Sequence, residues 1–224
     1  MSVSRCQRPF AETSVRFQNL TSEIDFLSPF AVVDEALSLP DRCPHLYDVQ
    51  LTVARWQGWR REDYDRLFEE AVVFAPRYRA LYRNKAIYLL PRWGGREGEW
   101  KEFAEDSANR LGGPEGEDLY YFLFSAMSAY YEDDEVLALL KPVWPRLRRS
   151  FEASEDLYGV NPDLLNMFGK YAYFAGDKET VQTMINRIGS HWNQGIWGNL
   201  DPAQVQTWAT SNNSTPFRPM GPWT

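Results

Sequence analysis

The sequence predicts an all-α fold, namely an α-solenoid of about four antiparallel helix pairs. Apolar residues recur at steps of three and four through most of the chain, which is the spacing of one helical face. Proline and glycine interrupt this pattern repeatedly, as expected for short turns between helices. A shift of about 36 residues also aligns two helix pairs, because it places Tyr64 on Trp100 and Leu67 on Phe103. We therefore expect helix pairs that bury their apolar faces against their neighbours.

Three regions follow from this pattern. Residues 1–28 lack helical periodicity and are a predicted N-terminal arm, residues 29–210 are the helical-repeat domain, and residues 211–224 are a proline-rich C-terminal tail. The repeat domain opens with a short predicted helix, which has Ser28 as N-cap and Pro29 at its first position. The apolar positions of this helix are Phe30, Val33, Ala36 and Leu37.

The first helix pair is predicted on either side of Gly58. Its first helix, of about 11 residues, carries one apolar stripe made of Leu46, Val49, Val53 and Trp56. Gly58 supplies the stop. The second helix covers residues 60–75, and its apolar face consists of Tyr64, Leu67, Phe68, Ala71, Val72 and Ala75. Acidic residues lie largely on its opposite face. Because only a short loop joins the two helices, the pair should form an antiparallel hairpin.

The second pair is punctuated by proline and glycine. Pro76 is expected to open its first helix, and Pro91 should stop or kink that helix by forcing Leu90 out of helical geometry. Gly94 and Gly95 complete the turn, and residues 98–111 form the partner helix.

Two further pairs follow. Residues 117–131 and 134–151 form the third, and Pro142 and Pro145 predict a kinked or broken helix in its second half. In the fourth, Asn161 caps a helix from residue 162, and a second helix covers residues 180–188. A partial capping helix is expected at residues 203–208, started by Asp201. The prolines beyond residue 211 exclude regular structure there.

The turn formed by residues 88–95, Tyr-Leu-Leu-Pro-Arg-Trp-Gly-Gly, carries a resemblance together with Trp100 and Phe103. It resembles an uncharacterised bacterial family marked by a leucine-proline-arginine-tryptophan-glycine turn. The stretches at residues 164–177, 188–189 and 197–198 resemble the closing repeat of the same family, and the helix pairs resemble tetratricopeptide-type repeats. The resemblance covers about residues 76–198 and implies a tetratricopeptide-like fold without an activity.

The composition limits which classes of partner and which cellular compartment we expect. The net charge of -7 argues against a general affinity for nucleic acid or for an anionic membrane. The longest apolar run, residues 119–131, is well short of the ~20 residues that span a bilayer, and residues 1–10 lack a signal-peptide core. The two cysteines, Cys6 and Cys43, form no disulfide or zinc motif. We therefore expect a cytoplasmic protein whose partner is a protein or peptide.

No residue pattern indicates catalysis or a bound cofactor or metal. His45 and His191 are unpaired in the sequence, and the glycines at 94–98 lack the Lys-Ser/Thr of a phosphate loop. The acidic clusters at residues 115–118 and 132–135 lie at predicted helix starts, where acids cap free N–H groups and meet the helix dipole favourably. The aromatic surplus is interpreted as filling gaps between helices.

The candidate partner-binding residues come from the face that the first helices of each pair would turn to a concave surface. They are Arg79, Arg83, Asn84, Asn166, Lys170 and Tyr173, to which we add Arg92 in the turn. The positively charged members could meet an acidic or C-terminal group of a partner. Arg92 could instead stack on an aromatic ring or bond to carbonyl groups at the broken helix end, which would be a structural role.

Three hypotheses remain open from the sequence. The leading one is a noncatalytic helical-repeat module that binds a protein or peptide, as an adaptor, chaperone or immunity-type inhibitor. The alternative is an α-helical enzyme that acts on a sugar or small molecule through paired carboxylates. In the third, the proline-rich tail with Phe217 and Trp223 docks into a groove on the same chain or on a neighbour.

Overall fold

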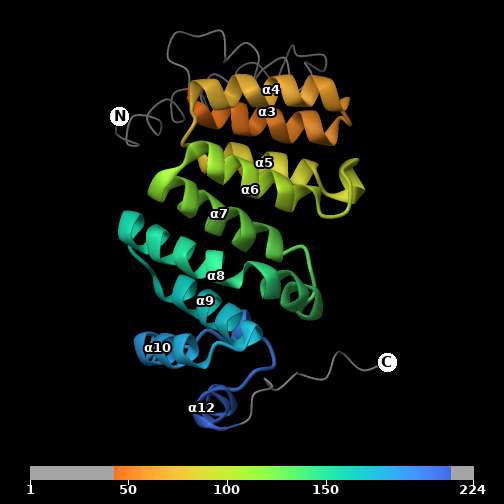
Figure 1. The fold of residues 1–224 in the computed structure, drawn as a ribbon. Helices are drawn as coiled ribbons and strands as arrows, with labels where there is room; N and C mark the ends of the chain where they lie inside the picture. The colour runs from red at the N-terminus through yellow and green to blue at the C-terminus, as the bar shows by residue number, and fades with distance from the viewer. Residues whose placement is uncertain (1–42, 213–224) are drawn as a thin grey trace, which may run out of the picture. The chain divides into compact units, whose positions relative to one another are not determined.

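The computed structural model describes residues 43–212, and every regular element in that range is helical (Figure 1). This confirms the all-α prediction. The predicted N-terminal arm, the predicted helix after Pro29 and almost all of the proline-rich tail lie outside the described residues. No helix in residues 43–212 is long and apolar enough to cross a membrane. The chain divides into two compact units, with the boundary between Phe103 and Ala104.

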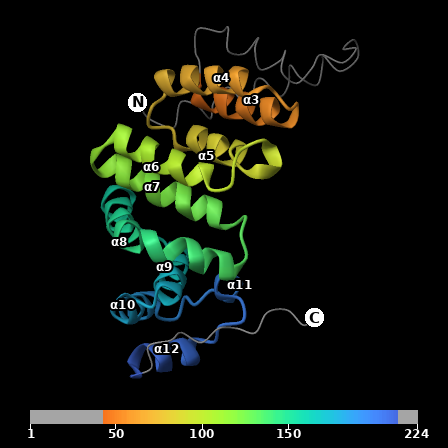
Figure 2. The same cartoon turned by 45° about the vertical axis from the view of Figure 1, so that its right-hand side comes forward.

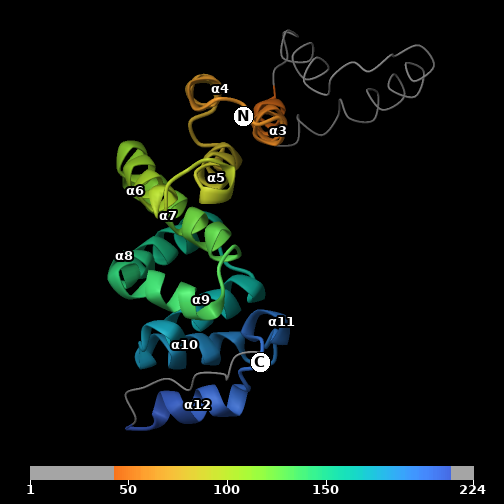
Figure 3. The same cartoon turned by 90° about the vertical axis from the view of Figure 1, so that its right-hand side faces the viewer.

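Unit 1 contains α3 (Pro44–Trp56), α4 (Arg61–Phe74) and α5 (Arg79–Tyr88). Figure 3 views these three helices nearly end-on, and α3 contacts both α4 and α5. The rings of Tyr64 on α4 and Tyr88 on α5 stack with their centroids 3.8 Å apart. The buried face of α4, formed by Tyr64, Leu67, Phe68 and Ala71, is the one that periodicity predicts.

The apolar stripe predicted for α3 is not its core face. Tyr47, Leu51 and Ala54 are fully buried, whereas Leu46, Val49 and Val53 are half-buried and Trp56 is 69 % exposed. The prediction failed because α3 carries apolar residues on two sides, and spacing alone does not select the side that meets α4 and α5.

The second predicted pair begins later than expected and ends where expected. Pro76 does not open α5, whose first residue is Arg79. The helix stops at Tyr88, and Leu90 is extended (φ -71°, ψ 146°), as predicted for a residue before proline. Residues Pro91–Trp93 form a single 3₁₀ turn. At Gly95 a Cβ atom would lie 2.0 Å from the Leu89 carbonyl oxygen, so only glycine fits there.

α6 (Glu99–Leu111) crosses the boundary and leads into unit 2, which also contains α7 (Gly113–Ser128) and α8 (Asp133–Tyr158). α8 packs along α7 and runs through Pro142 and Pro145 as one helix of 26 residues. The helix is therefore not broken there, and of the two predicted alternatives only a kinked helix is consistent with its continuity. Between the two prolines, Trp144 stacks on Phe168 and its indole N–H donates to Asp177 at 3.0 Å, so tertiary contacts hold this turn in place.

The rest of unit 2 is α9 (Pro162–Ala175), α10 (Lys178–Ile188), α11 (Gln194–Trp197) and α12 (Pro202–Thr210) (Figure 2). α10 contacts both α9 and α12. The predicted cap at Asn161 is confirmed, since its side chain accepts a backbone N–H of the first turn. Asp177 and Asp201 do the same at the starts of α10 and α12. Glu132 and Glu135 form a capping box at the start of α8, as expected for acids at a helix start.

Aromatic rings fill the core of unit 2. Phe151 on α8 and Phe168 on α9 stack at 3.8 Å, with Tyr121 edge-on to both. The Tyr121 hydroxyl is buried without a hydrogen-bond partner among the described residues, whereas the Tyr171 hydroxyl bonds to the Ser128 hydroxyl. Burial raises the pKa of both phenols, so both remain neutral and uncharged in the core.

These two tyrosines give a matched test of the core. Tyr171→Phe should lower the free energy of unfolding by about 1 kcal/mol, because it removes a buried hydrogen bond. Tyr121→Phe should leave the stability unchanged or raise it, because it removes a buried hydroxyl without a partner. Urea unfolding followed by circular dichroism measures both, and an equal loss in the two variants would contradict this description.

The start of α10 should be sensitive to acid. Burial alone would raise the pKa of Asp177, but bonds from the Thr180 N–H and hydroxyl and from Trp144 bring that pKa below its ordinary value. Asp177 therefore contributes stability above the unfolded-state pKa of about 3.9, and this contribution is lost as the pH falls through the lower folded-state pKa.

The stability gap between the wild type and Asp177→Asn should accordingly be present at pH 7 and shrink at about pH 3. Urea unfolding at the two pH values measures it. Asp106→Asn, at an exposed position on α6, is the matched control and should show little change at either pH. A gap for Asp177→Asn that is the same at both pH values would be inconsistent with the charged cap.

Candidate functional site

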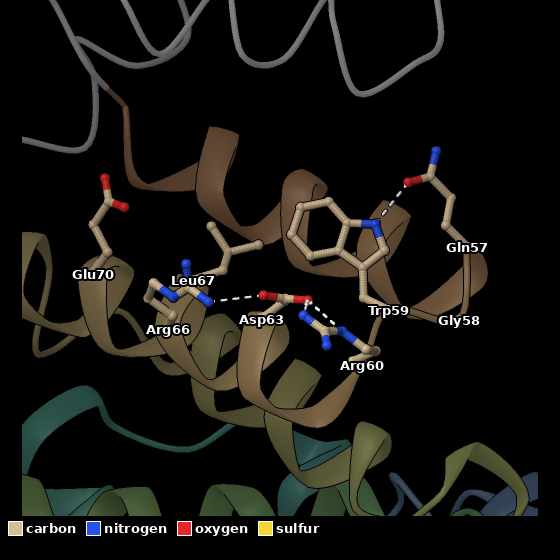
Figure 4. A pocket seen from close by; sticks show the side chains of 8 residues that line it. All are labelled: Gln57, Gly58, Trp59, Arg60, Asp63, Arg66, Leu67 and Glu70. Carbon is tan, nitrogen blue, oxygen red and sulfur yellow. Dashed lines mark hydrogen bonds and ion pairs between the residues drawn. The ribbon is translucent and has the colours of Figure 1, made fainter.

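An open pocket of about 560 Å³ lies on unit 1, between the α3–α4 connection and the outer face of α4 (Figure 4). Its lining residues are Gln57, Gly58, Trp59, Arg60, Asp63, Arg66, Leu67 and Glu70. They combine one indole ring and one leucine with four charged side chains, so the pocket offers both apolar and ionic contacts. We therefore take it as the candidate functional site.

Local geometry explains why these residues meet. On α4, residues 63, 66, 67 and 70 follow the three- and four-residue steps of one helical face. Gly58 has φ +66°, a left-handed conformation that turns the chain after α3 and brings Trp59 to the rim. The Trp59 carbonyl accepts the Tyr88 hydroxyl at 3.0 Å, and its indole N–H donates to Gln57 at 3.0 Å. One bond therefore holds the backbone of Trp59 and the other holds its indole ring.

The charged side chains of the pocket form a small ionic array. Asp63 accepts Arg60 Nε at 3.0 Å and an Arg66 terminal N–H at 2.7 Å (Figure 4). The two arginine side chains are 78 % and 75 % exposed, and each guanidinium carries five donors, so both retain N–H groups for a ligand. Glu70 accepts the Tyr47 hydroxyl at 3.0 Å. Asp63 thus fixes the direction of two accessible cations.

The two carboxylates of the pocket are not arranged as a facing catalytic pair. Asp63 and Glu70 belong to the same helix and are seven residues apart, which is a rise of about 10.5 Å along its axis. Each is already hydrogen-bonded to a neighbouring side chain. The hypothesis of an enzyme with paired carboxylates gains no support from this pocket.

A buried lysine lies on the other side of α4. Lys85 forms an ion pair with Asp65 and lies 5.3 Å from the ring centroids of both Tyr64 and Tyr88. Burial lowers the pKa of Lys85, against the opposing effect of its hydrogen bond to Asp65. Perturbed groups of this kind often mark functional sites, but Lys85 does not line the pocket. We interpret it as a cation that joins α4 to α5.

The candidate residues of unit 1 divide by accessibility. Asn84 is buried and donates to the Asp48 backbone carbonyl at 3.2 Å, while its own amide oxygen accepts the Thr52 hydroxyl at 3.1 Å. Arg83 also approaches the Asp48 carboxylate, at 3.9 Å. Asn84 therefore links α3 to α5. Its burial corrects the prediction that it lies on a surface facing a partner. Arg79 is half-buried and Arg92 is exposed.

The candidates of unit 2 are mostly internal as well. Asn166 is fully buried and makes four hydrogen bonds, whose partners are the Pro162 and His191 carbonyls, the Asn193 N–H and the Trp197 indole N–H. Tyr173 is buried against Trp197 and Trp208. These contacts correct the prediction that Asn166 and Tyr173 face a partner. Lys170 is half-buried, with an ion pair to Asp133 at 2.8 Å.

The sequence interpretation missed the pocket residues. Asp63 and Glu70 are among the acidic residues expected on the polar face of this helix, where Glu70 is exposed and Asp63 is half-buried. The sequence pattern that could have indicated the pocket is the series of side chains at positions 63, 66 and 70. It places an arginine between two acids on one helical face, close in sequence to Trp59. Residues 43–212 contain no group of three potential metal ligands.

Comparisons with protein-family models, with curated proteins and with solved structures find no match to this chain. The resemblance carried by residues 88–95 therefore remains a prediction.

Asn166 should behave as a structural residue. Asn166→Ala should lower the free energy of unfolding by roughly 2 to 4 kcal/mol, because it leaves a buried indole N–H and buried backbone groups without partners. Asn186→Ala, at an exposed position on α10, should change the stability by no more than about 0.5 kcal/mol. Urea unfolding compares the two, and a change as small in the Asn166 variant as in the control would show that the buried network contributes little.

Proposed function

We propose that this protein is a noncatalytic helical-repeat module that binds a segment of another protein or peptide. The observation that carries the proposal is the pocket of unit 1, in which Trp59 and Leu67 lie beside two exposed arginines oriented by Asp63. Tryptophan and arginine are both enriched among the residues that contribute most to binding at protein interfaces. We also propose the cytoplasm as the compartment, in keeping with two cysteines that form no recognisable motif.

The same proposal includes an α-solenoid of tetratricopeptide-like pairs. Two observations support it. Tyr64 and Trp100, which the shift of about 36 residues superimposes, are both fully buried. In unit 2, successive helices joined by short turns pack on one another, with α7 on α8, α8 on α9 and α9 on α10. In such an array a binding surface presents residues that remain accessible outside the core. In the pocket, Arg60 and Arg66 are exposed and Trp59 is half-buried, whereas Leu67 belongs to the buried face of α4.

The chemistry of the pocket defines the ligand class. Trp59 and Leu67 can accept an apolar side chain, and the spare N–H groups of Arg60 and Arg66 can accept a carboxylate in charge-assisted hydrogen bonds. The partner segment should therefore present an apolar residue close to an aspartate, a glutamate or a chain-terminal carboxylate. Because both arginines are solvent-exposed, their contribution should weaken as salt concentration rises.

A random peptide array probed with the purified full-length protein tests the proposal. We expect enrichment of peptides that combine an apolar and an acidic residue. Trp59→Ala and Arg66→Ala should each reduce the affinity for an enriched peptide about tenfold or more, since each removes a central contact.

Arg96→Ala is the matched control, because Arg96 is an exposed arginine of unit 1 outside the pocket, paired with Glu102 at 2.8 Å. It should leave the affinity unchanged. Enriched peptides whose binding is insensitive to Trp59→Ala and Arg66→Ala would place the binding surface elsewhere. Absence of any enrichment would overturn the proposed class of function.

A further inference from the structure

The helix α3 is apolar on two nearly opposite sides. One side is the buried core stripe of Tyr47, Leu51 and Ala54. The other, here named the second stripe, consists of Leu46, Val49, Val53 and Trp56. At 100° per residue the centres of the two stripes are about 150° apart around the helix axis. A helix that is apolar on both sides is expected to lie between two partners.

Within the described residues, the second stripe is incompletely covered. Its first three members are half-buried, and Trp56 is 69 % exposed although its ring meets Trp93 edge-on at 4.9 Å. The core stripe, by contrast, is entirely excluded from solvent. The apolar side chains that remain exposed along this face of α3 therefore form a candidate docking surface for another segment.

We propose that residues 29–39 of the same chain dock on the second stripe of α3. The sequence of this segment carries Phe30, Val33 and Leu37 at steps of three and four. Leu46, Val49 and Val53 follow the same two steps. The two apolar rows therefore have equal length, about 10.5 Å each at a helical rise, and can pair along their whole extent.

The chain itself favours this occupant over any separate molecule. Only residues 40–43 separate the segment from Pro44, the first residue of α3. Four residues can span about 14 Å, which exceeds the 8–10 Å between the axes of packed helices. Such a short link makes the local concentration of the segment far higher than that of a free partner. The covering segment would close the end of the helical array, as terminal repeats commonly do.

Hydrogen exchange on the full-length chain tests the proposal. In the Val33→Asp variant, a buried charge would release the segment, so exchange in peptides covering residues 44–56 should become about tenfold faster. In the reciprocal variant Val53→Asp, exchange in peptides covering residues 29–39 should rise to a similar degree. Val73→Asp, the same substitution at a position that is 83 % exposed on α4, should change neither region.

The other occupants are outcomes of the same experiment. Light scattering on the wild type shows whether the protein is a dimer. If Val53→Asp converts such a dimer to a monomer and exchange in residues 29–39 does not become faster, a second copy of the chain covers the second stripe. That result would overturn the proposal. Unchanged exchange at residues 44–56 in Val33→Asp would also overturn it. This variant remains decisive if Val53→Asp fails to fold, because residue 33 lies outside α3 to α12. The result is independent of the pocket, whose peptide binding is measured separately.

Discussion

Stacked aromatic rings between neighbouring helices are the packing interaction on which both units depend. Tyr64 meets Tyr88 in unit 1, and Phe151 meets Phe168 in unit 2, each pair with centroids 3.8 Å apart and planes 6° apart. A ring pair of this kind fills a wide interhelical gap with two stiff side chains and buries a large apolar area at low entropic cost. The aromatic richness of the sequence is thereby explained largely by packing between helices, whereas Trp59 lines the surface pocket of unit 1.

The polar atoms in these cores are arranged around the rings. Lys85 lies over the Tyr64 and Tyr88 rings while its charge is neutralised by Asp65, so the stacked pair can be buried beside a cation. In unit 2, Asn166 satisfies the indole N–H of Trp197 together with three backbone groups. Because each such group would be costly without its partner, these contacts also fix how neighbouring segments are aligned.

Local signals in the sequence predicted these helices and some of their ends. The cap at Asn161 and the stop before Pro91 depend on backbone groups within a few residues, which a sequence displays directly. Other ends differ, since α7 begins at Gly113 and α8 ends at Tyr158, outside the predicted ranges. Features that depend on contacts between helices were not predictable from such local signals. The spacing in α3 fits two faces equally well, and α8 continues through two prolines because Trp144 is anchored on Phe168 and Asp177.

The same distinction explains the candidate site. Asn84 and Asn166 are polar residues on helices, so periodicity assigns them to the surface, although hydrogen bonds to distant segments bury both. Asp63 and Arg66 are also polar, but their bonds to each other leave the arginine exposed. Only the hydrogen-bond partners in the folded structure distinguish the buried polar residues from the exposed ones. A polar residue on an amphipathic helix thus carries no functional information until its partner is known, and a charged pair that remains accessible beside an indole ring is the arrangement that supports recognition of another chain.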